Sequence, residues 1–411
     1  MSRGADVVVI GGGVVGASIA LEVARHGLGR VVLFDKAPGP GEGSTGASSS
    51  ICRTRYTHPA VVRLAIDGLD AYRRWSEYLR TTSSTASFVE TGVLWIADRT
   101  HDEVASEVQR LQALGAGAGL LDGTELTKRF PAISSCAAPL DWDTEHHCQS
   151  SPAFLFEDRA GYIDPMDTLS DLLVSAAASG VDLRFSSEVV GVDVDGSGVH
   201  GVRLADGGSI AADLVVNAAG PWCNQLNALA GVEHRWSFVP TRIQTLYRPW
   251  PSQEAGEIPV TIDVATGVYA RPERASSMVW IGSVREEDER EEVADPDEFA
   301  RSPSAGFRDT TLAAFAHRLP AVAARGNVTG IAGLYTINRQ DVHPVVGPSG
   351  VDGFWLANGF SGHGFKLAPM IGSMVAQALG AARHEFDTTV PMALFAIDRD
   401  PIGVDAKNVL A

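Results

Sequence analysis

The chain has 411 residues, 45% of them hydrophobic and 20% charged, a balance typical of a globular enzyme, and its length favours two domains. Fifty acidic against 33 basic side chains give a net charge of −17, which argues against a nucleic acid or an anionic membrane surface as a partner. Four cysteines are too few for a disulfide framework, and no window reaches the roughly 18 apolar residues of a membrane span, so we expect a cytoplasmic protein.

The N-terminal segment has the pattern of a β-α-β unit. The β-branched run Asp6–Ile10 predicts a buried parallel strand, and apolar residues at helical spacing predict a helix over Ala17–Arg25. Gly27 is placed to end that helix, and Val31–Phe34 predicts the next strand.

The turn between this first strand and its helix fits the dinucleotide-binding pattern G-x-G-x-x-G. Gly11 permits the tight turn, Gly13 lets the backbone approach a pyrophosphate, and Gly16 lets the helix pack closely on the strand. Asp35 follows about 20 residues later, where its carboxylate can accept hydrogen bonds from an adenosine ribose. We therefore predict a dinucleotide site here, which also includes Val14, Val15 and Lys36.

The rest of the chain continues the alternation of helices and strands. Apolar periodicity predicts a long helix from about Ala60 to Leu79, and Asp164 followed by Pro165 predicts the capped start of a helix over Met166–Ser179. Residues 236–300 have the pattern of strands and loops, and no linker divides the chain, so we expect two interleaved domains. Turn signals separate predicted strands at Val189–Val194, Val199–Leu204 and Leu214–Asn217.

Two later segments favour FAD as the dinucleotide. Val215–Gly220 is a strand that runs into small residues, which suits close approach by a cofactor already bound at the first strand. Ala357–Lys366 is a glycine-punctuated turn before another helix, and such a helix start can stabilise the negative charge of a reduced flavin at its pyrimidine end.

Together these segments resemble the superfamily of FAD enzymes that contains glycine oxidase, sarcosine oxidase and D-amino acid oxidase. The resemblance covers nearly the whole chain and is strongest to the monomeric sarcosine oxidase, or N-methyl amino acid oxidase, branch. The segments that carry it are VVVIGGGVVGASIA at the start, GSTGASSSICRTRY at 43–56, GYIDPMDTL at 161–169, VVNAAGPWC at 215–223, GLYTINRQDVHPVVGP at 333–348 and NGFSGHGFKLAP at 358–369.

The resemblance implies oxidation of the C–N bond of an amino acid, with a secondary, tertiary or cyclic amine as substrate. Arg53 and Lys366 match the residues that hold the substrate carboxylate in that branch, Tyr335 matches a tyrosine of the same pocket, and His363 matches a histidine against the flavin. Clamping the carboxylate aims the α-carbon hydrogen at flavin N5, hydride transfer gives an imine, and water hydrolyses the imine.

The chain also departs from the sarcosine oxidase pattern in the neighbourhood of the predicted pocket. The cysteine that attaches flavin in that branch is missing before Tyr335, so we expect noncovalent FAD. Ser50 replaces a second arginine, and Trp280 stands where that branch has a lysine that promotes reaction with oxygen. A cation near flavin stabilises developing superoxide, so the loss of this lysine disfavours fast reaction with O2. Two electron acceptors therefore stay open, O2 and another molecule.

From the resemblance we expect a Rossmann-like α/β FAD-binding domain interleaved with a smaller α+β substrate domain on a mixed, largely antiparallel sheet. The FAD-binding domain is predicted to comprise residues 1–80, 155–235 and 325–411, and the substrate domain residues 81–154 and 236–324. The remaining predicted cofactor-binding residues are Ser44, Thr45, Ser48, Ser49, Ser50, Val189, Ala219, Gly220, Trp222, Gly333, Gly359, Gly362, His363, Gly364 and Lys366.

The run Glu145-His146-His147-Cys148 raises the question of a metal site. Adjacent histidines alternate sides of a strand and no second ligand group is evident in the sequence, so we predict a loop without a metal. Two alternatives to the proposed chemistry stay open at this point. One is a deaminating oxidase or dehydrogenase of glycine or a D-amino acid, and the other is a flavoprotein subunit whose activity needs a partner chain.

Overall fold

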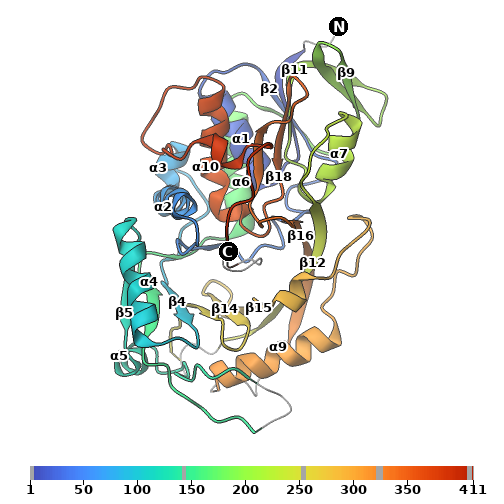
Figure 1. Ribbon diagram of the computed structural model, residues 1–411. Helices are drawn as coiled ribbons and strands as arrows, with labels where there is room; N and C mark the ends of the chain where they lie inside the picture. Colours follow the sequence, from blue (N-terminus) through green and yellow to red (C-terminus); the bar gives the residue numbers. More distant parts are fainter. Residues whose placement is uncertain (1–3, 141–144, 251–255, 321–326, 405–409, 411) are drawn as a thin grey trace.

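The computed structural model describes residues 4–140, 145–250, 256–320, 327–404 and 410, and it contains two large sheets with helices packed around them (Figure 1). The first sheet is mainly parallel and is built around the N-terminal strand, as the sequence predicts. Its order is β17 (Val345–Pro348), β18 (Phe354–Asn358), β11 (Ser209–Asn217), β1 (Ala5–Ile10), β2 (Val31–Phe34) and β8 (Asp182–Arg184), and the hairpin of β9 (Val189–Asp195) and β10 (Gly198–Leu204) extends β11.

Helices cover both faces of this sheet because its parallel strands are apolar on both sides. Val7 and Val9 of β1 face one core, and Val8 and Ile10 face the other. In Figure 1 α1, α6 and α10 lie together on the first face, where α1 and α10 are in direct contact. The helices on that face are α1 (Val14–Arg25), α2 (Pro59–Arg73), α3 (Trp75–Leu79), α6 (Pro165–Ala178) and α10 (Gly364–Ala378), whereas α7 (Cys223–Leu229), which follows the short helix η1 (Gly220–Trp222), lies on the second.

The second sheet is antiparallel except for one strand pair, and it forms the lower part of the molecule in Figure 1. One face packs toward the helices of the first sheet, and the other packs on α9 (Ala305–Arg318). Its order is β16 (Thr329–Asn338), β12 (Phe238–Pro249), β15 (Met278–Ser283), β14 (Val268–Glu273), β13 (Val260–Asp263), β4 (Val93–Ile96), β6 (Phe154–Glu157) and β5 (Ala118–Leu121), with α4 (His101–Ala113) and α5 (Gly123–Arg129) beside it.

Most local predictions are confirmed, and one helix differs from its prediction. Asp164 caps α6 through hydrogen bonds from the backbone N–H groups of Met166 and Asp167, as expected of an Asp-Pro start. The helix predicted from Ala60 to Leu79 is two helices that meet at Arg74, whose φ of −112° and ψ of 41° interrupt the helical backbone. The apolar stripe continues across this break, and therefore the sequence pattern does not reveal it.

The fold class expected from the resemblance is confirmed: a Rossmann-like domain is interleaved with a smaller α+β domain on a mixed, largely antiparallel sheet. The exact domain boundaries stay a prediction. β16 lies within a range assigned to the FAD-binding domain, and β6 spans the predicted boundary between residues 154 and 155; both strands pair with strands of the second sheet. The remaining short elements are β3 (Ile51–Cys52) paired with β7 (Gly161–Tyr162), η2 (Glu286–Glu289) and η3 (Met392–Phe395). No helix in the described ranges combines the length and apolar character needed to cross a membrane.

Candidate functional site

The glycine-rich turn after β1 has no room for side chains. Gly11 has a φ of 111°, in the region that favours glycine, and a Cβ there would overlap the carbonyl oxygen of Ala218 on the neighbouring strand. A Cβ at Gly16 would overlap the carbonyl oxygen of Gly11 itself. Both glycines are therefore required by the close packing of strand and helix, as the sequence motif predicts.

The turn delivers the N-terminus of α1 to a cavity. Gly13 is the N-cap residue and has no side chain to satisfy the first-turn N–H groups of the helix. The N–H of Val14 donates to Thr45 Oγ1 at 3.1 Å, and both residues line the cavity. A helix start in this arrangement binds phosphate through its backbone donors and its positive dipole end.

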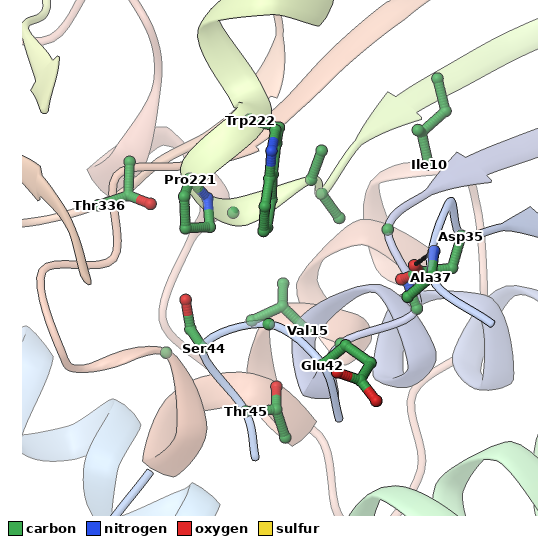
Figure 2. Close-up of a pocket in the computed structure, with 18 of the residues that line it drawn as sticks. Ile10, Val15, Asp35, Ala37, Glu42, Ser44, Thr45, Pro221, Trp222 and Thr336 are labelled. Atoms are coloured by element: carbon green, nitrogen blue, oxygen red, sulfur yellow. Dashed lines mark hydrogen bonds between the residues drawn. The ribbon is translucent and has the colours of Figure 1, made fainter. Parts of the chain in front are cut away.

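The cavity has a volume of about 550 Å³ and extends from the edge of the first sheet to the second. Figure 2 shows Asp35 and Ala37 at one end, Thr336 at the other, and Val15 between them. The Asp35 carboxylate accepts hydrogen bonds from the backbone N–H groups of Gly12 (2.7 Å) and Ala37 (2.8 Å), which fix its orientation beside the glycine turn. This volume and elongated lining suit a dinucleotide.

Three side chains that line the cavity, Lys36, Trp222 and Asp297, form a polar bridge. The Lys36 ammonium lies 2.6 Å from Asp297 Oδ1 and 4.4 Å from the centre of the Trp222 ring. Trp222 Nε1 donates to the same carboxylate oxygen at 3.1 Å. Asp297 belongs to the segment before α9, and hence the bridge connects parts of the chain that are far apart in sequence.

The structure brings most of the predicted cofactor-binding residues to this cavity. Six of them lie elsewhere. Gly16 packs behind the turn, Gly333 lies against Ala47, and the His363 side chain meets Tyr56. The other three, Ser49, Ser50 and Lys366, line a smaller neighbouring cavity. The predicted residues that line the cavity are Gly11, Gly13, Val14, Val15, Asp35, Lys36, Ser44, Thr45, Ser48, Val189, Ala219, Gly220, Trp222, Gly359, Gly362 and Gly364, together with Tyr335.

A second, smaller cavity of about 50 Å³ adjoins the Tyr335 end of the large one. Arg53, Tyr335 and Lys366, predicted from the resemblance to form the substrate pocket, all line it, as do Ser49 and Ser50. Both cationic side chains are buried, with 3% of Arg53 and 7% of Lys366 exposed. Burial, reinforced by the positive charge of Arg53, lowers the pKa of Lys366 to about 7.

Arg53 is positioned by a strained turn and a buried carboxylate. Ser50 has a φ of 48°, in the left-handed region, and its Oγ donates to the carbonyl of Ile163. Just after Arg53, Thr54 donates its N–H (2.6 Å) and its hydroxyl to Glu157 Oε2. The guanidinium then lies over the ring of Tyr56, 4.4 Å from its centre.

Sequence reasoning missed six residues that line the small cavity: Ile51, Ile262, Tyr269, Val284, Phe365 and Leu410. Ile262 and Tyr269 are register partners on β13 and β14, and Tyr269 forms a side-chain hydrogen bond with Ser49. No local pattern marks them, because strand pairing alone brings them to Arg53. Phe365 had a signal in the sequence, since it lies directly before Lys366.

Two of the residues predicted to be catalytic, His363 and Trp280, lie outside both cavities. The buried imidazole of His363 meets the edge of Tyr56 (5.3 Å between ring centres), and the residue contributes to the site as the N-cap of α10. Trp280 on β15 packs against the guanidinium of Arg271, which is stacked between it (4.3 Å) and Tyr162 (4.4 Å).

A parallel sheet, a glycine turn opening on an elongated cavity and a helix N-terminus at that turn define a dinucleotide-binding protein. A family model described as DAO, FAD dependent oxidoreductase, matches residues 6–378, so the chain belongs to this family. It is an FAD-dependent oxidoreductase.

The chain is similar along most of its length to several characterised proteins. It is 27% identical to glycine oxidase of Geobacillus kaustophilus, over 97% of the chain and 98% of that protein. It is 26% identical to monomeric sarcosine oxidase of Streptomyces avermitilis, over 96% and 99%. It is 25% identical to human mitochondrial dimethylglycine dehydrogenase, over 93% of the chain but only 43% of that longer protein.

Among solved structures, L-proline dehydrogenase from P. horikoshii superimposes with a TM-score of 0.80 at 24% identity, covering 96% of this chain and 97% of that one. This likeness agrees with the fold described above.

Proposed function

We propose that the chain oxidises the C–N bond of a small secondary, tertiary or cyclic amino acid, whose carboxylate is held between Arg53 and Lys366. The observation that carries the proposal is the meeting of these two buried cations with Tyr335 in one small cavity beside the large one. A volume of about 50 Å³ favours a substrate with a short side chain.

The charge of the pocket favours an anionic group on the substrate. Two cationic side chains in a buried site disfavour each other, which contributes to the lowered pKa of Lys366. A carboxylate between them would relieve that repulsion, and the planar guanidinium of Arg53 can bind both of its oxygens. Such a clamp fixes the orientation of the substrate. When two reactants are held in one site, correct orientation supplies a large part of the rate enhancement.

The apolar part of the pocket lining favours a neutral amine. Ile262, Tyr269 and Phe365 present apolar and aromatic surface there. An apolar wall disfavours an ammonium ion and lowers the pKa of a bound amine, leaving the nitrogen lone pair free to assist loss of hydride from the α-carbon. Apolar surface also accommodates N-methyl or ring carbons better than it accommodates a primary ammonium.

The large cavity fits FAD, which when bound accepts the hydride. We propose that the N-terminus of α1 holds the pyrophosphate and that Asp35 holds the adenosine ribose. The N-terminus of α10, where Gly364 lines the cavity, would stabilise negative charge on the reduced ring system.

The electron acceptor is proposed to be a molecule other than O2. Trp280 stands where the resemblance places an oxygen-promoting lysine, and its ring packs on Arg271 instead of entering either cavity. Without a lysine there, less positive charge is available to stabilise superoxide.

The test is anaerobic mixing of the purified yellow protein with sarcosine, dimethylglycine, proline, pipecolate, glycine and D-amino acids, following loss of the oxidised flavin absorbance. Bleaching by an N-substituted or cyclic member supports the proposal, and readmitting air then compares reoxidation by O2 with reoxidation by an artificial acceptor. Bleaching by glycine or a D-amino acid alone would instead identify the deaminating alternative, which the glycine oxidase relative favours. No bleaching by any member, with FAD present, would contradict the proposal and point to a missing partner chain.

A further inference from the structure

Four potential metal ligands meet on the face of the second sheet that is opposite the proposed substrate pocket. They are Cys136, His146 and Cys148 in the segment between α5 and β6, and His317 near the end of α9. One ligand atom from each residue lies within 4.8 Å of every other. We propose that these side chains bind a structural zinc ion in a site of two thiolates and two imidazoles.

The distances approach those of a tetrahedral zinc site. With Zn–S of about 2.3 Å and Zn–N of about 2.0 Å, ligand atoms around zinc lie roughly 3.3–3.8 Å apart. Cys136 Sγ is 3.4 Å from His146 Nε2, and the rings of His146 and His317 are 4.4 Å apart between centres at 80°. The remaining ligand atoms lie within 4.8 Å of one another, so side-chain shifts of up to about 1–1.5 Å would complete the coordination.

An independent observation also indicates a ligand at this place. The Nε2 atom of His317 is buried and has no hydrogen-bond partner among the described residues. A buried polar atom of this kind is costly unless something binds it. The other histidine-containing cluster, Glu22 with His26 and His384, differs in this respect, because both Glu22 oxygens accept hydrogen bonds from Arg25.

The backbone around the cluster is held in place without a metal. Arg318, the neighbour of His317, donates to the carbonyl oxygens of Ser134 and Cys136, and its Nε donates to Asp263 at 2.7 Å. Arg318 and Asp263 are each only 1% exposed. This buried ion pair connects α9, β13 and the loop, so Cys136 and His317 are already brought together before metal binding.

The chemistry of the four ligands favours zinc in a structural role. Thiolates with imidazoles in tetrahedral geometry suit Zn²⁺, and the two thiolate charges neutralise the ion. All four positions are filled by protein, which leaves no open position for a substrate or water. Cys148 is exposed, which gives the ion a path from solvent.

This proposal departs from the sequence prediction of a loop without a metal. That prediction rested on the absence of a second ligand group near His146 and Cys148, and the fold supplies that group from Cys136 and from the distant His317. The described residues place the site away from the flavin cavity, so the proposal does not depend on the substrate proposed above.

The test is metal analysis of protein produced in zinc-supplemented medium, purified without a histidine tag and dialysed. We expect about one zinc ion per chain in the wild type and below about one tenth in a Cys136→Ser/Cys148→Ser double variant. The control is His147→Ala, which removes an exposed neighbouring histidine outside the cluster and should keep the full zinc content. Flavin absorbance in each sample reports whether the protein is folded.

A second measurement on the wild type alone covers the case in which the double variant does not fold. Cobalt exchanged into the site should give the intense visible bands of tetrahedral S2N2 coordination, at wavelengths longer than those of oxidised flavin, and added zinc should abolish them. Zinc-free wild type with normal flavin content, zinc retained by the double variant, or a Cys136–Cys148 disulfide in the purified protein would each overturn the proposal.

Discussion

The lowered pKa of Lys366 predicts that carboxylate binding weakens as the pH rises. With a pKa of about 7 in the free enzyme, about half of the Lys366 side chains are charged at pH 7, about one tenth at pH 8 and about one hundredth at pH 9. If only the charged form binds a carboxylate tightly, Kd rises about fivefold from pH 7 to 8 and about fiftyfold from pH 7 to 9, or about 2.3 kcal/mol. Below pH 7 the lysine is mostly charged already, and Kd levels off.

The assay is titration of the oxidised protein with propionate, which is a carboxylate at every pH in the range and has no amine to titrate. Binding is followed by the perturbation of the flavin spectrum between pH 6 and 9. Lys366→Met is the matched variant, because it keeps the length of the side chain but cannot be charged, and it should bind weakly with little dependence on pH. A wild-type Kd that stays within a factor of two across this range, or a Lys366→Met profile that rises like the wild type, would refute the reasoning.

Three further predictions concern the cofactor turn, the carboxylate clamp and the buried guanidinium of Arg271. Gly16→Ala would drive a methyl group into the carbonyl of Gly11 and should abolish bound flavin, measured by the ratio of visible to protein absorbance, whereas Gly306→Ala, in open space, should not change it. Arg53→Ala should raise KM for the carboxylate substrate at least tenfold with flavin content unchanged, and an unchanged KM would mean that the carboxylate binds elsewhere. Trp280→Leu removes one of the two rings stacked on the Arg271 guanidinium and should lower the free energy of unfolding by about 1–2 kcal/mol, measured by urea titration. Trp280→Phe should show a smaller loss.

The features that the sequence predicts well are those decided by neighbouring residues. The glycine turn, the first β-α-β unit and the Asp164 cap each depend on residues within a few positions of one another, and all are found as expected. The break at Arg74 was missed, although it is local, because the apolar stripe of the two helices is continuous.

The features that the sequence does not reveal arise from pairing between distant segments. Tyr269 reaches the small cavity because β14 pairs with β13. Its neighbour Ala270 faces the opposite core, since successive side chains of a strand alternate between the two faces of the sheet. Cys136 and His317 meet only after α9 packs under the second sheet. The positions of Arg53 and Lys366 followed from family resemblance, since neither residue carries a local signal of its own.

The paired strands β12 and β16 have a consequence for how the molecule can move. Phe238, at the start of β12, is buried in a core of the first sheet, whereas Leu246, further along the same strand, is buried in the core above α9. β16 accompanies β12 in unbroken register from Phe238–Asn338 to Tyr247–Thr329. Because a two-stranded ladder resists bending more than a single linker does, we expect the two domains to stay at a nearly fixed angle during turnover.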